Sequence, residues 1–148
     1  MKKEDNLKKY FSGAFAAEAL INKLGEDIAV LRSKQAGSRV KLSHTGRNTT
    51  NHKRNEEISI AVMELEEEIA KAKFALLELE KEIKNMTDTL TSHTARAVII
   101  WRYVCRYKWK DIAERAEMSE MQVIREHNAA MVHMTVAAED DDFEWLWA

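Results

Sequence analysis

A regular spacing of apolar residues runs through the middle of the chain. Between residues 58 and 86 it alternates steps of four and three, at Ile58, Val62, Leu65, Ile69, Ala72, Leu76, Leu79, Ile83 and Met86. Such steps place these side chains along one face of a helix, as in the seam of a coiled coil. Asn55, followed by two glutamates, suits a helix start. The pattern predicts a long helix that begins at Asn55.

A weaker repeat with the same rhythm precedes this helix, at Leu7, Tyr10, Ala14, Ala17, Ile21, Leu24, Ile28 and Leu31. It is interrupted by Gly13 and Gly25, and each glycine costs a helix about 1 kcal/mol relative to alanine. We therefore expect residues 1–86 to form a long antiparallel helical hairpin, coiled-coil-like, that serves oligomerisation. The seam closes either within one chain or between two chains, and periodicity favours neither.

Glycines and small polar residues over residues 36–52 predict a loop at the tip of this hairpin. The net charge of the chain is −2, but residues 28–55 carry seven basic and no acidic side chains. A basic loop over 36–54 is a candidate phosphate contact, and a merely solvated loop is the alternative. The phosphate-contact hypothesis names Arg39, Lys41, Arg47, Lys53 and Arg54.

Composition supports an all-α fold, because the 148 residues include no proline and only four glycines. The single cysteine, Cys105, cannot close an internal disulfide, and we expect it to be a buried thiol without a redox role. The apolar runs are far shorter than the ~20 residues that cross a bilayer, so we expect no membrane contact and a cytoplasmic location.

A helix-turn-helix pattern follows over residues 87–138. Hydroxyl residues at 87–92 suit a break and a new cap, and an apolar helix of about 14 residues comes next. Ser119 and Gln122 have the spacing of a capping box that starts a helix over 119–134. The helix-turn-helix itself lies within residues 109–128. Its two helices are predicted to share a core made of Ile112, Ala113, Ala116, Met118 and Val123.

Four side chains should lie away from this core. Met121, Gln122, Arg125 and Asn128 are candidates for reading base edges in the major groove, where glutamine or asparagine suits adenine and arginine suits guanine. Phosphate contacts would come from basic residues ahead of the motif and from its cap, namely Arg96, Arg102, Arg106, Lys108, Lys110 and Ser119.

These residues resemble a known family, the phage late-gene transcriptional regulators of the ArpU/RinA type, whose C-terminal part is similar to region four of bacterial sigma factors. The resemblance rests on ArgTyr at 102–103, Trp109, IleAla at 112–113, Val123 followed by ArgGluHis, and GlySerArgVal at 37–40. It implies a phage or prophage protein that acts in a bacterial host cell and binds promoter or operator double-stranded DNA as a homodimer or higher homo-oligomer. The turn position that glycine usually fills is Glu117, so either this residue is left-handed or the turn differs.

Two alternative functions remain open at this stage. A phage small terminase subunit also joins a helix-turn-helix to an oligomerising hairpin, and the same fold can act as a protein-binding adaptor.

The tail over 139–148 combines five acids with large aromatic residues. It either folds back onto the helices or docks into RNA polymerase or another phage protein. The docking hypothesis names Phe143, Trp145 and Trp147.

We expect no enzyme, because nothing arranges a nucleophile beside an activating base. No cofactor and no metal are expected either, since the chain has no glycine-rich phosphate loop, and His127 and His133 do not share one helix face. Trp101 and Trp109 are predicted to pack in the core.

Overall fold

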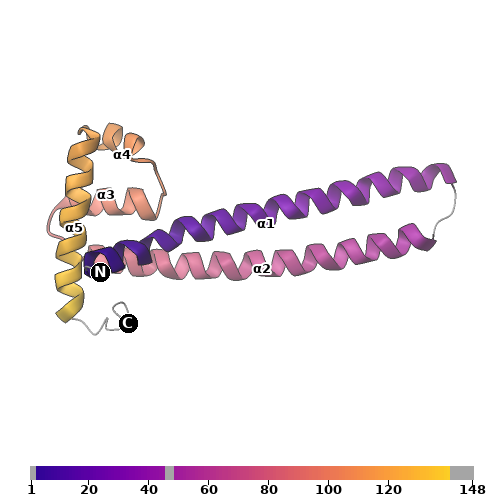
Figure 1. The fold of residues 1–148 in the computed structure, drawn as a ribbon, viewed down its shortest axis with the longest axis horizontal. Helices are drawn as coiled ribbons and strands as arrows, with labels where there is room; N and C mark the ends of the chain where they lie inside the picture. The colour runs from indigo at the N-terminus through magenta and orange to yellow at the C-terminus, as the bar shows by residue number, and fades with distance from the viewer. Residues whose placement is uncertain (1–2, 46–48, 141–148) are drawn as a thin grey trace. The chain divides into compact units, whose positions relative to one another are not determined.

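The computed structural model describes residues 3–45 and 49–140, and side chains within 3–37 and 52–137. This part of the chain forms helices and no strand, which confirms the all-α class (Figure 1). The helices are α1 (Lys3–Thr45), α2 (Thr49–Thr87), α3 (His93–Tyr103), α4 (Trp109–Ala116) and α5 (Glu120–Asp140).

Helices α1 and α2 contribute to two compact units. The hairpin unit is Ala17–Ala75, and the C-terminal unit contains the chain up to Ala16 and from Leu76 onward. Within the hairpin unit, Ile28 of α1 is buried in one cluster with Ile58 and Val62 of α2. Leu31, Leu65 and Ile69 pack partly buried against that cluster. The predicted seam of this unit is therefore filled within one chain, which decides the alternative that periodicity left open.

The predicted loop over residues 36–54 is wrong for most of its length. Helix α1 continues to Thr45 and α2 begins at Thr49, and only residues 46–48 of that stretch lie outside the described part. The segment has no proline to stop a helix. Gly37 costs a helix only about 1 kcal/mol relative to alanine, and the arginine, lysine and leucine residues around it favour the helix. The helix propensity of this segment therefore outweighs its turn-like residues.

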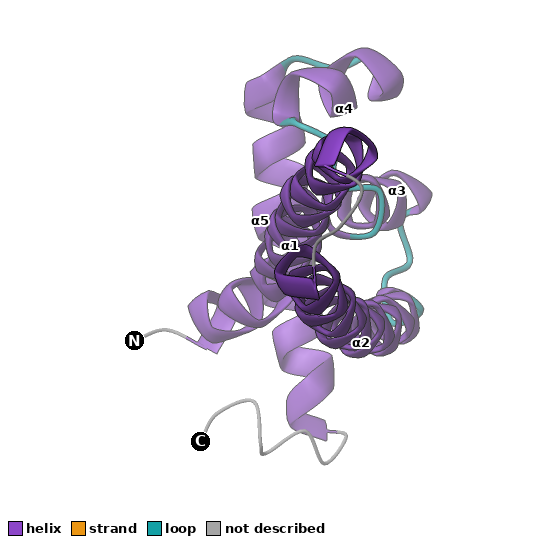
Figure 2. Ribbon diagram, turned by 90° about the vertical axis from the view of Figure 1, so that its right-hand side faces the viewer, coloured by secondary structure: helices purple, strands orange, loops and turns teal. Residues whose placement is uncertain are grey.

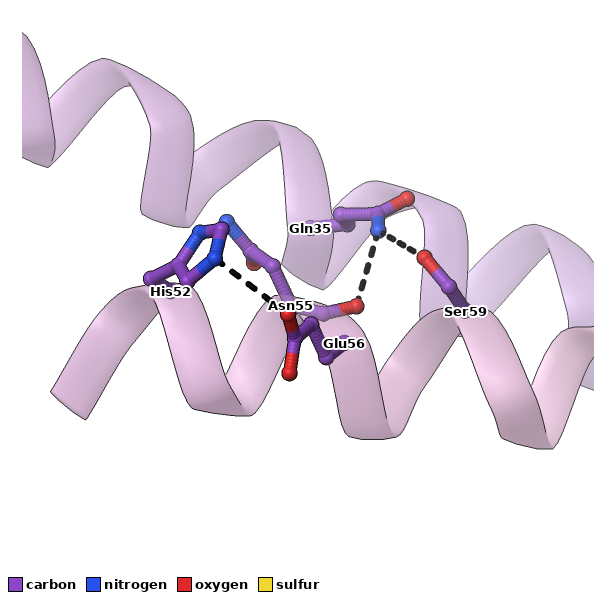
Figure 3. Close-up of polar contacts among 5 residues, drawn as sticks. All are labelled: Gln35, His52, Asn55, Glu56 and Ser59. Carbon is purple, nitrogen blue, oxygen red and sulfur yellow. Dashed lines mark hydrogen bonds and ion pairs between the residues drawn. The ribbon is translucent and has the colours of Figure 1, made fainter. Parts of the chain in front are cut away.

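A polar layer continues the apolar seam of the hairpin unit (Figure 3). Gln35 of α1 donates from Nε2 to the backbone oxygen of Asn55, at 3.1 Å, and to Oγ of Ser59, at 2.8 Å. Because α2 begins at Thr49, Asn55 lies inside the helix, and its predicted role as the helix cap is wrong. Its Oδ1 is buried and has no hydrogen-bond partner among the described residues.

The C-terminal unit has a core built from four helices. Leu7 and Phe11 of α1 are fully buried there, together with side chains of α2, α3 and α5. Figure 2 shows α5 beside α3 and joined to α4 by a short loop. The buried members of this core are Leu7, Phe11, Ile83, Met86, Leu90, Ala95, Ile99, Tyr103, Ala130, Met131 and Met134.

The break predicted at 87–92 is confirmed. The side chain of Ser92 caps α3 by accepting a hydrogen bond from the backbone N–H of Ala95 at 3.2 Å. Helix α3 then ends at Tyr103, earlier than predicted, so Cys105 follows it in the connection to α4. Cys105 is exposed, and the expectation of a buried thiol is wrong.

Candidate nucleic-acid interface

Helices α4 and α5 are joined by a turn of three residues that contains a strained backbone position. Glu117 ends α4 with φ 55° and ψ 43°, the left-handed conformation that glycine usually adopts. The N–H of Met118 donates to the oxygen of Ala113 at 3.0 Å, and the N–H of Glu117 donates to that of Glu114 at 3.4 Å. These two bonds form a Schellman-type ending. A glutamate therefore occupies the left-handed turn position directly.

The capping box that begins α5 is present as predicted. Oγ of Ser119 accepts from the backbone N–H of Gln122 at 3.2 Å, and Oε1 of Gln122 accepts from the N–H of Ser119 at 3.3 Å. The start of α5 is therefore defined by its own sequence.

The core shared by α3, α4 and α5 contains the predicted residues. Val98, Ile112, Ala113 and Val123 form one buried cluster. Trp101, Tyr107, Trp109, Ala116 and Met118 pack against it partly buried, so both tryptophans serve packing as expected. This cluster fixes which face of α5 points inward.

The four predicted base-reading side chains are all exposed on α5. Met121 is 66% exposed, and Gln122, Arg125 and Asn128 also belong to the exposed class. Met121, Arg125 and Asn128 follow one another in steps of four and three, so they share one face of the helix. The structure thus brings the predicted residues together on one surface.

Hydrogen bonds within the protein orient two amides of this surface. Oε1 of Gln122 is engaged by the N–H of Ser119, and Oδ1 of Asn128 lies 3.0 Å from Nδ1 of His127. Because an amide oxygen accepts, Nδ1 of His127 is the donor in this pair. The amide nitrogens of Gln122 and Asn128 then supply the donor function of these two side chains.

His127 is buried beneath this surface and links Asn128 to Tyr103, a role that the sequence analysis did not predict. Its Nε2 lies 2.6 Å from the hydroxyl of Tyr103, and both side chains are almost fully buried. Burial lowers the pKa of His127 to about 4 and raises the pKa of Tyr103 to about 12. A neutral His127 with its proton on Nδ1 accepts from Tyr103 and donates to Asn128.

Three of the predicted phosphate contacts are engaged inside the C-terminal unit. The guanidinium of Arg102 lies 4.2 Å from the ring centroid of Trp109 and donates to the backbone oxygen of Tyr107 at 3.0 Å. Burial lowers its pKa. Arg106 forms a partly buried ion pair with Glu80 at 2.9 Å, and Nε of Arg96 donates to the oxygen of Leu90 at 2.7 Å. These three arginines hold the fold around the surface.

The other predicted phosphate contacts differ in exposure and in whether the structure describes them. Five of them are exposed, namely Lys108, Lys110, Ser119, Lys53 and Arg54. The structure describes the helical backbone at Arg39 and Lys41 but not their side chains. Arg47 lies outside the described residues, as do the tail residues Phe143, Trp145 and Trp147.

Arg115 is a further exposed cation that the sequence reasoning passed over. Its guanidinium lies 4.3 Å from the ring centroid of Tyr107, which holds it beside the last turn of α4. The available signal was its place near the end of α4, on the side of the helix away from Ala113.

No protein-family model matches the chain, and neither a curated protein nor a solved structure is detectably similar to it. Within the described ranges, no helix is both long enough and apolar enough to cross a membrane.

Proposed function

We propose that this chain is a sequence-specific DNA-binding transcriptional regulator that reads base edges with α5. The observation that carries the proposal is the division of α5 into two faces. Val123 and His127 are buried against α3 and α4, whereas Met121, Arg125 and Asn128 are exposed together. A helix that is buried on one face, with polar side chains projecting from the other, has the form that enters a major groove.

The chemistry of the exposed residues fits base recognition. The guanidinium of Arg125 can donate two hydrogen bonds to O6 and N7 of guanine, and Met121 can contact a thymine methyl group. Gln122 and Asn128 act through their amide nitrogens, because their oxygens accept bonds within the protein. A purine N7 is the acceptor that complements such a donor. We therefore propose that these two amide nitrogens donate to purine N7 atoms in the major groove.

Phosphate contacts in this proposal come from the exposed groups around the turn. Lys108, Lys110 and Arg115 are exposed cations on or beside α4. Backbone N–H groups at the start of α5 add a weak preference for anions. Such contacts position the protein on any sequence and leave the choice of sequence to Arg125 and its neighbours.

Arg125→Ala tests the recognition surface directly. We expect it to lose about 1–3 kcal/mol of preference for the best site over unrelated DNA, which is roughly a 5- to 150-fold loss in the ratio of affinities. The measurement is a gel shift on DNA flanking the gene and on a selected random pool, at two salt concentrations. Lys84→Ala, which removes an exposed charge from α2, is the matched control. If Arg125→Ala binds every DNA like the parent, the recognition surface is wrong.

A protein-binding adaptor is a second candidate, because α5 also exposes apolar side chains. Ile124 is 37% exposed, Val132 47% and Val136 58%. Exposed apolar side chains on one helix are a feature of protein-binding surfaces. Absence of any DNA binding at low salt would favour this function over the first.

A further inference from the structure

The outer face of α2 carries a second apolar stripe that nothing covers in the described chain. Ile60 is 57% exposed, Met63 67%, Phe74 66% and Leu77 48%. Ile60 and Phe74 each lie two residues after a position of the buried seam, and Met63 and Leu77 each lie two residues before one, which is about 200° around the helix in either direction at 100° per residue. Because the seam on the inner face is already filled by α1, this stripe needs a different partner.

The stripe has the same spacing in both directions along the helix. Its six positions, separated by steps of three, four, three, four and three, are Ile60, Met63, Glu67, Ala70, Phe74 and Leu77. Two copies of α2 that meet antiparallel therefore place Ile60 opposite Leu77 of the partner subunit and Met63 opposite Phe74 of the partner subunit. Such self-complementarity is what a two-fold interface requires.

Charged residues beside the stripe are complementary in the same arrangement. Glu64 and Lys71 flank it on one side and are exposed; on the other side Lys73 is exposed, whereas Glu66 forms an ion pair with Arg32 of α1 at 2.7 Å. In an antiparallel pair the same flank of each helix faces the other. Glu64 then faces Lys71 of the partner subunit. Charges at these flanking positions set partner choice and orientation in coiled coils.

Glu67 selects the antiparallel orientation over the parallel one. A parallel pair in register stacks the two Glu67 carboxylates within the apolar stripe, and like charges there repel. The antiparallel pair instead places the small Ala70 opposite Glu67, so the carboxylate has room to turn toward water. Polar residues at seam positions are known to specify orientation in this way.

The corresponding face of α1 lacks these features. Leu20 is 49% exposed and Val30 53%, but Lys23 and Asp27 form an exposed ion pair between them at 3.1 Å. Two charged residues therefore interrupt the apolar character of this face, whereas on α2 only Glu67 interrupts a stripe of 18 residues, which rises about 26 Å at 1.5 Å per residue. This contrast places the self-association surface on α2.

We infer that the chain forms a homodimer through antiparallel pairing of the outer faces of two α2 helices, centred between Glu68 and Ile69. The inference is independent of the proposed DNA binding, and its tests contain no DNA. A failure of the dimer tests therefore does not affect the proposal of DNA binding, and a failure of the DNA-binding tests does not affect the dimer.

The mass of the full-length protein is the first test. Sedimentation equilibrium should give a dimer for the parent and a monomer for Phe74→Glu, with unchanged helical circular dichroism, because Phe74 is exposed. Leu20→Glu, a matched change on the outer face of α1, should remain a dimer. A monomeric parent at high micromolar concentration, a ring of many subunits, or a dimeric Phe74→Glu would overturn the inference.

Charge reversal tests the pairing of the flanks. Glu64→Lys and Lys71→Glu should each raise the dimer dissociation constant about tenfold, because each change turns two attractive pairs of the dimer into repulsive ones. The double variant restores opposite charges in both pairs and should return the constant to near the parent value. Additive weakening in the double variant would contradict the proposed register.

Cross-linking tests the orientation. In a Cys105→Ser background, Ala70→Cys places its thiols close to the two-fold axis, whereas Ile60→Cys places them about 26 Å apart along the pair. A bismaleimide of about 10 Å span should link the first variant efficiently and the second poorly. Efficient linking of both variants would indicate a parallel pair and would overturn the inference.

Discussion

At the scale of single residues, the buried contact between Tyr103 and His127 makes the stability of the C-terminal unit depend on pH. Burial lowers the pKa of His127 to about 4, from an ordinary value near 6.5. Between these two values the unfolded chain binds more protons than the folded one. The contribution of His127 to stability is therefore complete above pH 6.5 and falls as the pH drops toward 4, by about 3 kcal/mol at 1.36 kcal/mol per pKa unit.

His127→Gln isolates this effect, because glutamine does not titrate and its oxygen can still accept from Tyr103. We expect the free energy of unfolding of the parent to fall more steeply between pH 7 and pH 4.5 than that of His127→Gln. Urea unfolding of both proteins over this range measures the difference, and carboxylates common to the two cancel. Equal pH dependence in the two proteins would show that His127 is not buried as described.

At the scale of the element, the ending of α4 can be improved by one substitution. Glu117 has a φ of 55°, and a residue with a side chain adopts this conformation at a cost of about 1–2 kcal/mol. Glu117→Gly removes that strain, so we expect it to raise the free energy of unfolding by about 1 kcal/mol. Glu114→Gly, inside the same helix, should lower it by about as much. Thermal unfolding compares them, and destabilisation by Glu117→Gly would contradict the turn geometry.

A second element, the polar layer of the hairpin unit, contains a buried acceptor without a described partner. Removing Oδ1 of Asn55 removes its desolvation cost, which is about 1–3 kcal/mol for such a group. Asn55→Leu should therefore raise the melting temperature of the protein. Ser59→Leu replaces the hydroxyl that accepts from Gln35 and should give no such gain. A lower melting temperature for Asn55→Leu would show that this oxygen is satisfied in solution.

At the scale of the whole molecule, the proposed DNA contact divides into a sequence-reading part and a charge part. Lys53 and Arg54 of α2 are exposed and belong to the stretch without acidic residues. If this stretch contacts phosphates, Lys53→Ala with Arg54→Ala should weaken binding to all sequences alike. The slope of log K against log salt should shrink by about two. Gel shifts at several salt concentrations measure this, and an unchanged slope would confine the contact to the C-terminal unit.

Much of the local structure is predictable because it depends on neighbouring residues. The Ser119–Gln122 capping box and the Ser92 cap form from side chains three residues apart, and both occur where the sequence places them. Turn-like residues mislead where nothing local stops a helix, as at Gly37, which α1 passes through. Exposure of Met121, Gln122, Arg125 and Asn128 also follows from the helical period. Each of these features is written in a short stretch of chain.

The all-helical class, the buried faces of the helices and the caps of α3 and α5 could be predicted from the sequence, because they depend on periodicity and short-range hydrogen bonds. What each face packs against follows from the three-dimensional fold alone. It closed the seam of the hairpin unit within one chain, engaged Arg102 and Arg106 in internal contacts, and buried His127 under Asn128. Residues distant in sequence meet in these contacts, and a periodic pattern states that a face is covered without stating by what.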